Sequence, residues 1–232
     1  MTPTSIRTRT AVAAVAAVAA TAVALLAAAC GSGDPAADAP AEDPAAVDVT
    51  APPQIASWST FGGIAVPLGR EDGPTSTPGA PLTGFTRTPQ GAALAAIGQS
   101  VQLSTATDSA WSTILPAVTT PGAGRDAYAG NRALIQVSGT DPAVVPSIIG
   151  YTLPAYSPDA ATVSIIQEFS DDSLAAVAAE VVWSGEDWKL ALPAPEREPV
   201  PQDFVTAEVA GNPVTPLDAP PADMVALDGA PR

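Results

Sequence analysis

Histidine is absent from the 232-residue chain. Its absence removes the side chain that most often acts as a general base, the Ser–His and Cys–His pairs that activate nucleophiles, and the commonest metal ligand. The serine and threonine residues form no nucleophile elbow, and the acidic residues show no metal-ligand spacing. We therefore expect a non-enzymatic protein with no catalytic residue, no cofactor and no metal.

Cysteine is nearly absent, and the single residue of this type, Cys30, cannot form an intramolecular disulfide. It follows an uncharged alanine, valine and leucine run over residues 11–29, and Arg7 and Arg9 form a short basic segment before that run. This order is typical of a secretory signal peptide, which we predict over residues 1–29.

The sequence around Cys30 leaves three ways of processing open. Residues 25–30, L-L-A-A-A-C, resemble a bacterial lipobox, although the large apolar residue usually found three positions before the cysteine lies one position further back, at Leu26. Alanines 27–29 would also suit ordinary signal peptidase and a free secreted protein. An uncleaved run would be near the minimum of about 17 residues for a membrane span. We favour a lipid on Cys30 that anchors the protein to the outer face of the cell membrane.

Basic side chains are scarce, because nine Lys and Arg residues stand against 24 Asp and Glu residues, for a net charge of −15. Loss of Arg7 and Arg9 with the signal peptide would change this charge to −17. An acidic surface repels phosphate backbones, so we expect no nucleic-acid partner. Arg87 and Arg132 are isolated in the sequence, and we expect both to be solvated. The acidic, alanine-rich and lysine-poor composition is typical of an actinobacterium.

The chain divides into a tether, a domain and a tail. Residues 30–54 mix glycine, serine, proline, alanine and acidic residues with almost no large apolar side chain, which predicts a disordered acidic tether. Residues 55–193 contain the periodic segments and form the predicted domain. Residues 194–232 are proline-rich, and we expect a mostly extended tail with a short edge segment around residues 204–209 as one alternative.

The clearest helix start lies within residues 84–97, G-F-T-R-T-P-Q-G-A-A-L-A-A-I. Thr88 can cap the first free backbone N–H groups, and Pro89 suits the first helical position. The alanines that follow favour a helix, which we expect over residues 89–103. Apolar residues recur at i, i+3 and i+7 from Leu94, so the pattern predicts one buried stripe.

Two further helices and one irregular segment are predicted beside this helix. The second helix should begin near Asp108, a good N-cap, with apolar residues at helical spacing from Trp111, and Pro116 should kink or shorten it. A weaker third helix covers about residues 125–137. Residues 55–81, which precede all three helices, are rich in glycine and proline and predict a loop or short strand that lays aromatic side chains against the domain.

From residue 147 onwards, the spacing of the apolar residues changes from that of a helix to that of a strand, in which every second residue is apolar. Strands are predicted over residues 147–153, 162–169, 174–183 and 188–192. The short turns between them make these strands antiparallel neighbours. The predicted strand over residues 174–183 is rich in alanine, so a helix remains an alternative for this segment. The predicted fold class is α+β, with three N-terminal helices packed on a curved, cone-like antiparallel sheet of about four strands.

The last hairpin, V-V-W-S-G-E-D-W-K-L at residues 181–190, resembles the closing strands of the nuclear-transport-factor-like cone fold of the ketosteroid isomerase superfamily. Together with Trp58 and residues 84–96, it is similar to a family of uncharacterised actinobacterial exported proteins and lipoproteins that are often encoded with conjugative elements. The resemblance covers about residues 58–193. It implies a concave sheet crossed by helices, with a cone-shaped cavity between them.

Five residues on the predicted strands are candidates for the wall of this cavity: Tyr151, Glu168, Glu180, Trp183 and Trp188. An inward carboxylate with a raised pKa would be a proton-transfer device. Nothing pairs Glu168 with Glu180, however, so we prefer the interpretation that both face solvent. Trp183 and Trp188 flank a hairpin turn, where core packing is commoner than a binding platform.

Two functions follow from these observations. We predict an envelope-tethered accessory or assembly protein that presents its domain to protein partners outside the membrane, with conjugation or secretion as the context that the resemblance implies. The alternative is an exported protein that binds a small molecule in the cone cavity. An open apolar pocket with one inward carboxylate would favour the alternative, whereas a cone filled with side chains would exclude it.

Overall fold

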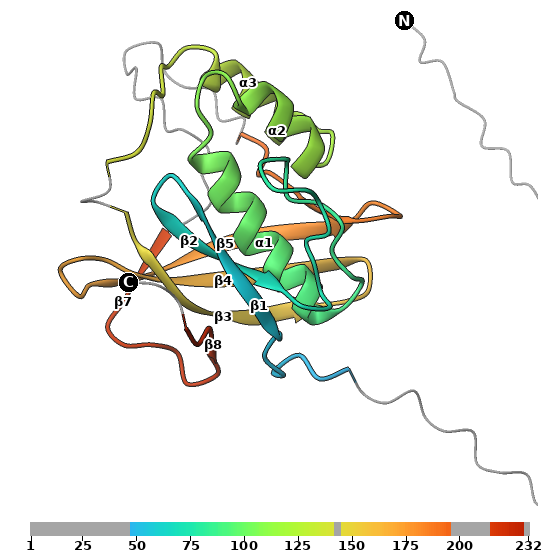
Figure 1. The fold of residues 1–232 in the computed structure, drawn as a ribbon, viewed down its shortest axis with the longest axis vertical. Helices are drawn as coiled ribbons and strands as arrows, with labels where there is room; N and C mark the ends of the chain where they lie inside the picture. The colour runs from blue at the N-terminus through green and yellow to red at the C-terminus, as the bar shows by residue number, and fades with distance from the viewer. Residues whose placement is uncertain (1–46, 142–144, 196–213, 230–232) are drawn as a thin grey trace, which may run out of the picture. The chain divides into compact units, whose positions relative to one another are not determined.

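The computed structural model describes residues 47–141, 145–195 and 214–229 (Figure 1). The predicted signal peptide, Cys30, most of the tether and the 204–209 edge segment lie outside these residues. No helix in the described part is long and apolar enough to cross a membrane. The elements run in the order β1 (Ile55–Phe61), β2 (Ile64–Gly69), α1 (Pro89–Ser104), α2 (Trp111–Val118), α3 (Ala123–Arg132), β3 (Ser147–Tyr156), β4 (Ala160–Glu168), β5 (Leu174–Trp183), β6 (Trp188–Leu190), β7 (Val214–Leu217) and β8 (Val225–Ala226).

The fold is α+β with three helices, as predicted, but the helices do not come first. Strands β1 and β2 precede them and form an antiparallel hairpin, where the sequence analysis expected a loop or a short strand. Gly62 and Gly63 form its two-residue turn with φ angles of 55° and 88°. Positive φ at both turn positions matches the twist of the flanking strands and requires glycine-like residues, so the Gly-Gly pair produces the hairpin.

Helix α1 begins as the sequence predicts. The Thr88 hydroxyl accepts a hydrogen bond from the Gly91 N–H at 2.9 Å, and Pro89 occupies the first turn. The predicted single buried stripe is too narrow, because nearly every α1 side chain from Ala92 to Leu103 is buried. The helix contacts β2, α2 and the sheet that begins with β3, and burial on nearly all of its sides fits this central position.

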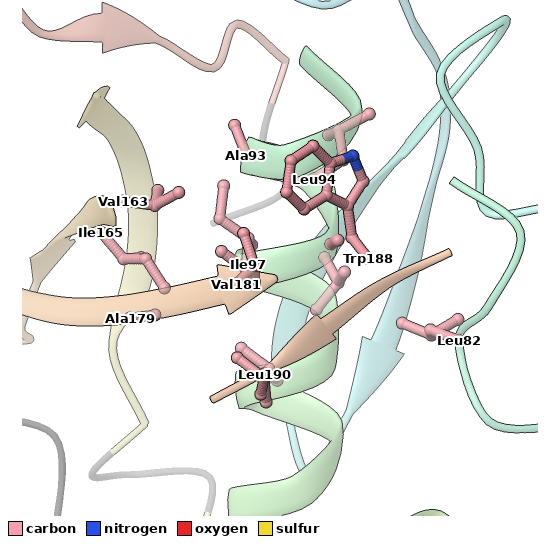
Figure 2. Close-up of a cluster of buried hydrophobic side chains, with 14 of the residues drawn as sticks. Leu82, Ala93, Leu94, Ile97, Val163, Ile165, Ala179, Val181, Trp188 and Leu190 are labelled. Carbon is pink, nitrogen blue, oxygen red and sulfur yellow. The ribbon is translucent and has the colours of Figure 1, made fainter. Parts of the chain in front are cut away.

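The core lies between α1 and the large sheet. Figure 2 shows Leu94 and Ile97 of α1 among the sheet residues Val181, Trp188 and Leu190. All five of these side chains are almost completely removed from solvent. Trp188, the alanines of α1 and the aliphatic strand residues belong to one continuous core cluster.

The second and third helices are shorter than predicted. Helix α2 has Ala110 at its N-cap position instead of Asp108, whose carboxylate accepts the Val137 N–H at 3.0 Å. Pro116 lies inside α2, which ends two residues later. Helix α3 ends at Arg132, whose guanidinium donates to the Ile135 carbonyl oxygen at 3.1 Å. The Val137 N–H and the Ile135 carbonyl oxygen thus bond to side chains, whereas in a longer α3 they would bond to the helix backbone.

The large sheet has six strands instead of about four. Strands β3, β4, β5 and β6 form the predicted antiparallel meander, and the alanine-rich β5 is a strand with the predicted bounds. The two additional strands come from the C-terminal region: β7 pairs with β5, and β8 pairs with the outer edge of β3. The proline content of this region did not prevent pairing, because β7 and β8 are short edge strands.

The segment between β7 and β8 crosses the sheet on the face opposite α1. Strand β4 lies between the strands that β7 and β8 join, so residues 218–224 must pass over it. Ile166 of β4 points to this face and is nevertheless fully buried. Its cross-strand neighbour Gly150 leaves room for Met224, whose Cγ would lie 2.7 Å from a Cβ at position 150. The C-terminal segment thus covers apolar side chains on the second face of the sheet.

Candidate ligand-binding cavity

A cavity of about 340 Å³ lies between the C-terminal half of α1, the N-terminal half of α3 and the face of the sheet that α1 covers. Its wall is mainly aliphatic. The lining residues are Ile64 of β2; Ser100, Val101, Leu103 and Ser104 of α1; Gly124 and Tyr128 of α3; Ile165 and Gln167 of β4; Val177 of β5; and Leu190, Leu192 and Pro193 at the end of the meander. This volume is at the lower end of the range for small-molecule sites.

The α1 wall of the cavity contains two serines where larger side chains would fill the space. The Ser104 hydroxyl donates to the Val101 carbonyl oxygen at 3.1 Å, which is the ordinary arrangement for a helical serine. The Ser100 hydroxyl oxygen is buried and has no hydrogen-bond partner among the described residues.

Gly124 allows α3 to approach the chain that follows β6. A Cβ at this position would overlap the carbonyl oxygen of Leu192 and would lie 2.7 Å from that of Pro193. One turn further along α3, the Tyr128 hydroxyl donates to the Leu103 carbonyl oxygen at 3.0 Å. These two contacts place α3 against α1 and the end of the meander, so α3 forms one wall of the cavity.

The cavity wall is uncharged. None of its lining residues is acidic or basic, and burial raises the pKa of the Tyr128 hydroxyl above its ordinary value, so this group stays neutral at physiological pH. No group of three or more acidic or cysteine side chains in the described ranges could hold a metal ion. The arrangement suits retention of an apolar molecule.

The lining of this cavity includes none of the five strand residues proposed from the sequence. Tyr151 is fully buried opposite Ile165 in the β3–β4 ladder. Glu180 is exposed and Glu168 is half-buried, and each alternates with neighbours that face α1, so both lie on the opposite face of the sheet. Glu180 lines a separate, more open hollow on the outside of the β3–β5 hairpins.

The two tryptophans of the last hairpin pack in the core beside the start of α1. Trp188 is fully buried, and its Nε1–H donates to the Thr86 carbonyl oxygen at 2.8 Å. The Trp183 ring meets the Trp188 ring edge-on, with centroids 5.5 Å apart. The Arg87 guanidinium lies 5.5 Å from the centre of the Trp183 ring, a cation–π contact. The tryptophans therefore join the hairpin to α1 and do not line the cavity.

Asp187 is the buried anchor that sequence reasoning missed. Its carboxylate accepts the backbone N–H groups of Gly84, Phe85 and Trp188 at 2.8, 2.9 and 2.9 Å. The contact joins the turn between β5 and β6 to the segment that enters α1. The available signal was an Asp directly before a Trp at the end of a turn, where an acidic side chain commonly accepts nearby backbone donors.

Arg132 is buried, so the expectation that it is solvated is wrong. It pairs with Asp108 at 2.8 Å and donates to the Ala106 carbonyl oxygen at 3.1 Å. Its guanidinium also lies 5.8 Å from the centre of the Trp111 ring. Arg87 is half-exposed and forms an ion pair with Asp159. Arg132 therefore holds α3 against the connection between α1 and α2, whereas Arg87 lies at the surface.

Comparison with known proteins found one relationship. Residues 10–210 match a protein family described as a domain of unknown function (DUF8175). The matched region extends from the apolar N-terminal run through the helices and strands β3 to β6, and it ends before β7 and β8. The chain matched no curated protein and no solved structure.

Proposed function

We propose a function for this chain, which belongs to the DUF8175 family. It is an exported, membrane-tethered protein without enzymatic activity, and it binds an apolar ligand in the cavity between α1, α3 and the sheet. The observation that carries the proposal is the cavity itself, an uncharged, mainly aliphatic and partly open space of about 340 Å³ between these elements. Small-molecule sites are usually concave pockets of this kind, with mainly apolar walls and a few polar groups, so the pocket favours a binding role.

The residues around the cavity favour binding over catalysis. Its polar lining residues are Ser100, Ser104, Tyr128 and Gln167. The inward carboxylate that the sequence analysis associated with a ligand-binding cone is missing from the lining. A cone-like sheet enclosing this space is part of the proposal and is supported by the antiparallel meander beneath α1.

The N-terminal sequence supports a location outside the cell membrane. A basic segment, an apolar run and Cys30 precede the acidic residues that lead into the domain. The family match includes this run and Cys30. We propose that a lipid on Cys30 anchors the chain and that residues 31–54 hold the domain away from the membrane surface. Mass spectrometry of the mature N-terminus tests this anchor, because an unmodified N-terminus at or after residue 30 would contradict it.

The binding proposal is tested with a neutral photoreactive probe, an octyl diazirine, added to the full chain in phospholipid nanodiscs. We expect saturable labelling of peptides that contain cavity-lining residues. Val177→Phe places a larger side chain in the cavity and should sharply reduce this labelling. Val182→Phe is the matched control, because Val182 lies on the same strand and is 36% exposed on the opposite face. Equal labelling of both variants, or labelling confined to the surface, would contradict the proposal.

The second candidate function is to present the domain to a protein partner of the cell envelope, in conjugation or secretion. Adjacent Leu134 and Ile135 favour it, because they are 84% and 57% exposed after the end of α3. A Leu134→Asp, Ile135→Asp double variant should lose its cross-linked partner in intact cells while the cavity is still labelled. Unchanged cross-linking would remove the reason for this candidate.

A further inference from the structure

We propose that the free edge of β1, the side of this strand that does not face β2, pairs with the same edge of a second copy of this chain. Two β1–β2 hairpins would then form one continuous antiparallel sheet. The inference goes beyond the proposed ligand-binding function and does not depend on it. It is carried by an exposed and uncharged strand edge in a domain whose other described edge strands are short, charged or interrupted by proline.

Strand β1 uses one of its two edges. Within the described ranges, its backbone pairs with β2 and bonds to no other backbone group. Strand β2 also contacts α1 and β3, whereas among the described elements β1 packs closely against β2 alone. None of the seven residues of β1 is buried, and Ala56, Ser57 and Thr60 are exposed. The backbone N–H and C=O groups on the free edge are therefore open to another strand.

The other described edge strands of the domain have the devices by which natural sheets prevent edge-to-edge pairing. Strand β8 has two residues, and β7 has four, one of which is Pro216. Strand β6 has three residues, including Lys189. Strand β1 has seven residues without a proline or a charge, and its one irregularity lies at its start, between Ile55 and Ser57. An unprotected edge of this length is expected to be paired.

The sequence of β1 suits a second copy as the partner. Two identical strands that are related by a two-fold axis pair antiparallel, so each strand meets its own sequence in reverse. In I-A-S-W-S-T-F, residue size and polarity read almost the same in both directions from Trp58. Pairing about this residue places Ile55 opposite Phe61 and Ser57 opposite Ser59 of the other copy. Apolar side chains and hydroxyl groups each meet their own kind in this register.

The charge distribution also allows two copies to meet at this edge. The chain has a net charge of −15, so two copies repel each other on approach. Residues 49–69, which include the whole hairpin, contain no Asp, Glu, Lys or Arg. Pairing at β1 therefore brings no charged side chains of the two hairpins together. It also adds strands to a two-stranded hairpin, which is only marginally stable by itself.

Disulfide trapping in membranes of intact cells tests the pairing and its register. Two full-length copies with different tags are expressed together, one with Ser57→Cys and the other with Ser59→Cys. Directly opposed residues of antiparallel strands have Cα atoms about 4.5 to 5.5 Å apart, which suits a disulfide. We expect mild oxidation to link this mixed pair at about ten-fold higher yield than two copies that both carry Ser57→Cys, because those two positions are out of register.

Two copies with Ser112→Cys, at an exposed position on α2, measure the background from random collision. Cys30 is present in every version, so any disulfide that it forms contributes equally to all of them.

An added charge on the edge provides the variant and its control. Thr60→Glu in both copies places a carboxylate on the free edge and should reduce the disulfide yield of the mixed pair about ten-fold. Thr113→Glu adds the same charge at an exposed position on α2 and should leave the yield unchanged. Thermal unfolding of both variants checks that the domain is folded.

Four results would overturn the inference. A mixed-pair yield no higher than that of the Ser112→Cys pair would show that the free edges do not meet. Equal yields for the mixed pair and for two Ser57→Cys copies would exclude the two-fold register. An equal loss of yield with Thr113→Glu would mean that overall charge, and not the edge, controls the association. A disulfide to a different protein would identify that protein, instead of a second copy, as the occupant of the edge.

Discussion

Buried polar side chains determine how the long segment between β2 and α1 is held. Gln99 donates from Nε2 to the carbonyl oxygens of Leu82 and Trp188 at 3.2 and 2.8 Å. Gln102 binds the same segment, because its Oε1 accepts the Leu82 N–H at 2.8 Å. Asp187 binds the next residues of the segment from the other side. Each contact satisfies backbone groups that would otherwise be buried without partners.

The Asp187 contact leads to the first prediction. Asp187→Ala should lower the free energy of unfolding by about 3 kcal/mol, because it leaves the buried backbone N–H groups of Gly84 and Phe85 without an acceptor. Glu186→Ala, the exposed neighbour in the same turn, should change it by less than about 0.5 kcal/mol. Urea unfolding followed by tryptophan fluorescence measures both. Equal stability of the two variants would show that the carboxylate does not anchor the segment.

Tyr151 makes the stability sensitive to alkaline pH. Burial, reinforced by the nearby negative charge of Asp72, raises the pKa of its hydroxyl. A raised pKa in the folded state contributes stability that is fully present below the unfolded value, about pH 10, and is lost as pH rises towards the folded value. Tyr151→Phe should therefore lose less stability above pH 10 than the unsubstituted protein.

The control for this pH effect is Tyr156→Phe. Burial raises the pKa of Tyr156 as well, but Arg87 opposes the increase and the side chain is only partly buried. This variant should keep most of the alkaline loss of stability. Thermal unfolding measured at several pH values checks both variants, and parallel curves for Tyr151→Phe and the unsubstituted protein would count against the assignment.

Among the elements, α1 is unusual because small residues allow close contact on all of its sides. Ala92, Ala93, Ala95 and Ala96 are completely buried, and their small side chains bring the helix close to the hairpin, the sheet and the loop before it. Gly91 allows a similarly close contact in the first turn of α1, because a Cβ at this position would overlap the Thr86 carbonyl oxygen. The helix therefore obtains its stability from contacts with its surroundings more than from its own propensity.

Two helical glycines give a matched pair of substitutions with opposite expected effects. Gly91→Ala should destabilise the protein by about 2 kcal/mol, because the methyl group would displace the Thr86 backbone. Gly130→Ala in α3 meets no atom within 4 Å and should stabilise it by about 0.5 to 1 kcal/mol through better helix propensity. Chemical unfolding curves measure both. A stabilising Gly91→Ala would show that the first turn has room to relax.

Local signals in the sequence predicted the elements that depend on neighbours in the chain. Thr88 and Pro89 specify the start of α1, and alternation specified β5 despite its alanine content. Contacts between distant residues could not be predicted in this way. Asp108 has the chemistry of an N-cap but binds Val137 and Arg132, because its partners return to it from later in the chain. The same reason explains why α3 is shorter than predicted.

At the scale of the whole molecule, neither the cavity nor the C-terminal strands could be predicted from the sequence, because both depend on what packs beside them. The five proposed wall residues were chosen by strand position, whereas the cavity lies where Ser100, Ser104 and Gly124 leave space between elements. Small residues give a weak sequence signal, since the space they leave depends on what packs opposite them. Likewise, the residues after 213 contain too few apolar positions to show a period, and they form strands because β3 and β5 offer open edges.

The C-terminal strands make the domain depend on residues that looked like a tail. Leu227 is buried, and its N–H donates to the Ile149 carbonyl oxygen at 3.0 Å beside β8. Leu227→Asp should lower the free energy of unfolding by about 3 kcal/mol, because it buries a charge without a partner. Val214→Asp, in the same C-terminal region but 61% exposed, should change it by less than about 0.5 kcal/mol.

Urea unfolding distinguishes an integral C-terminal region from a loosely attached one. If residues 214–229 are part of the cooperative unit, Leu227→Asp shifts the midpoint of the single unfolding transition and leaves its slope unchanged. The same shift should expose the outer face of the sheet, where Met224 lies beside Gly150, to hydrogen exchange at β4. A Leu227→Asp variant with an unshifted midpoint and unchanged β4 exchange would mean that the sheet is complete without β8, so that only β3 to β6 support α1 and the cavity.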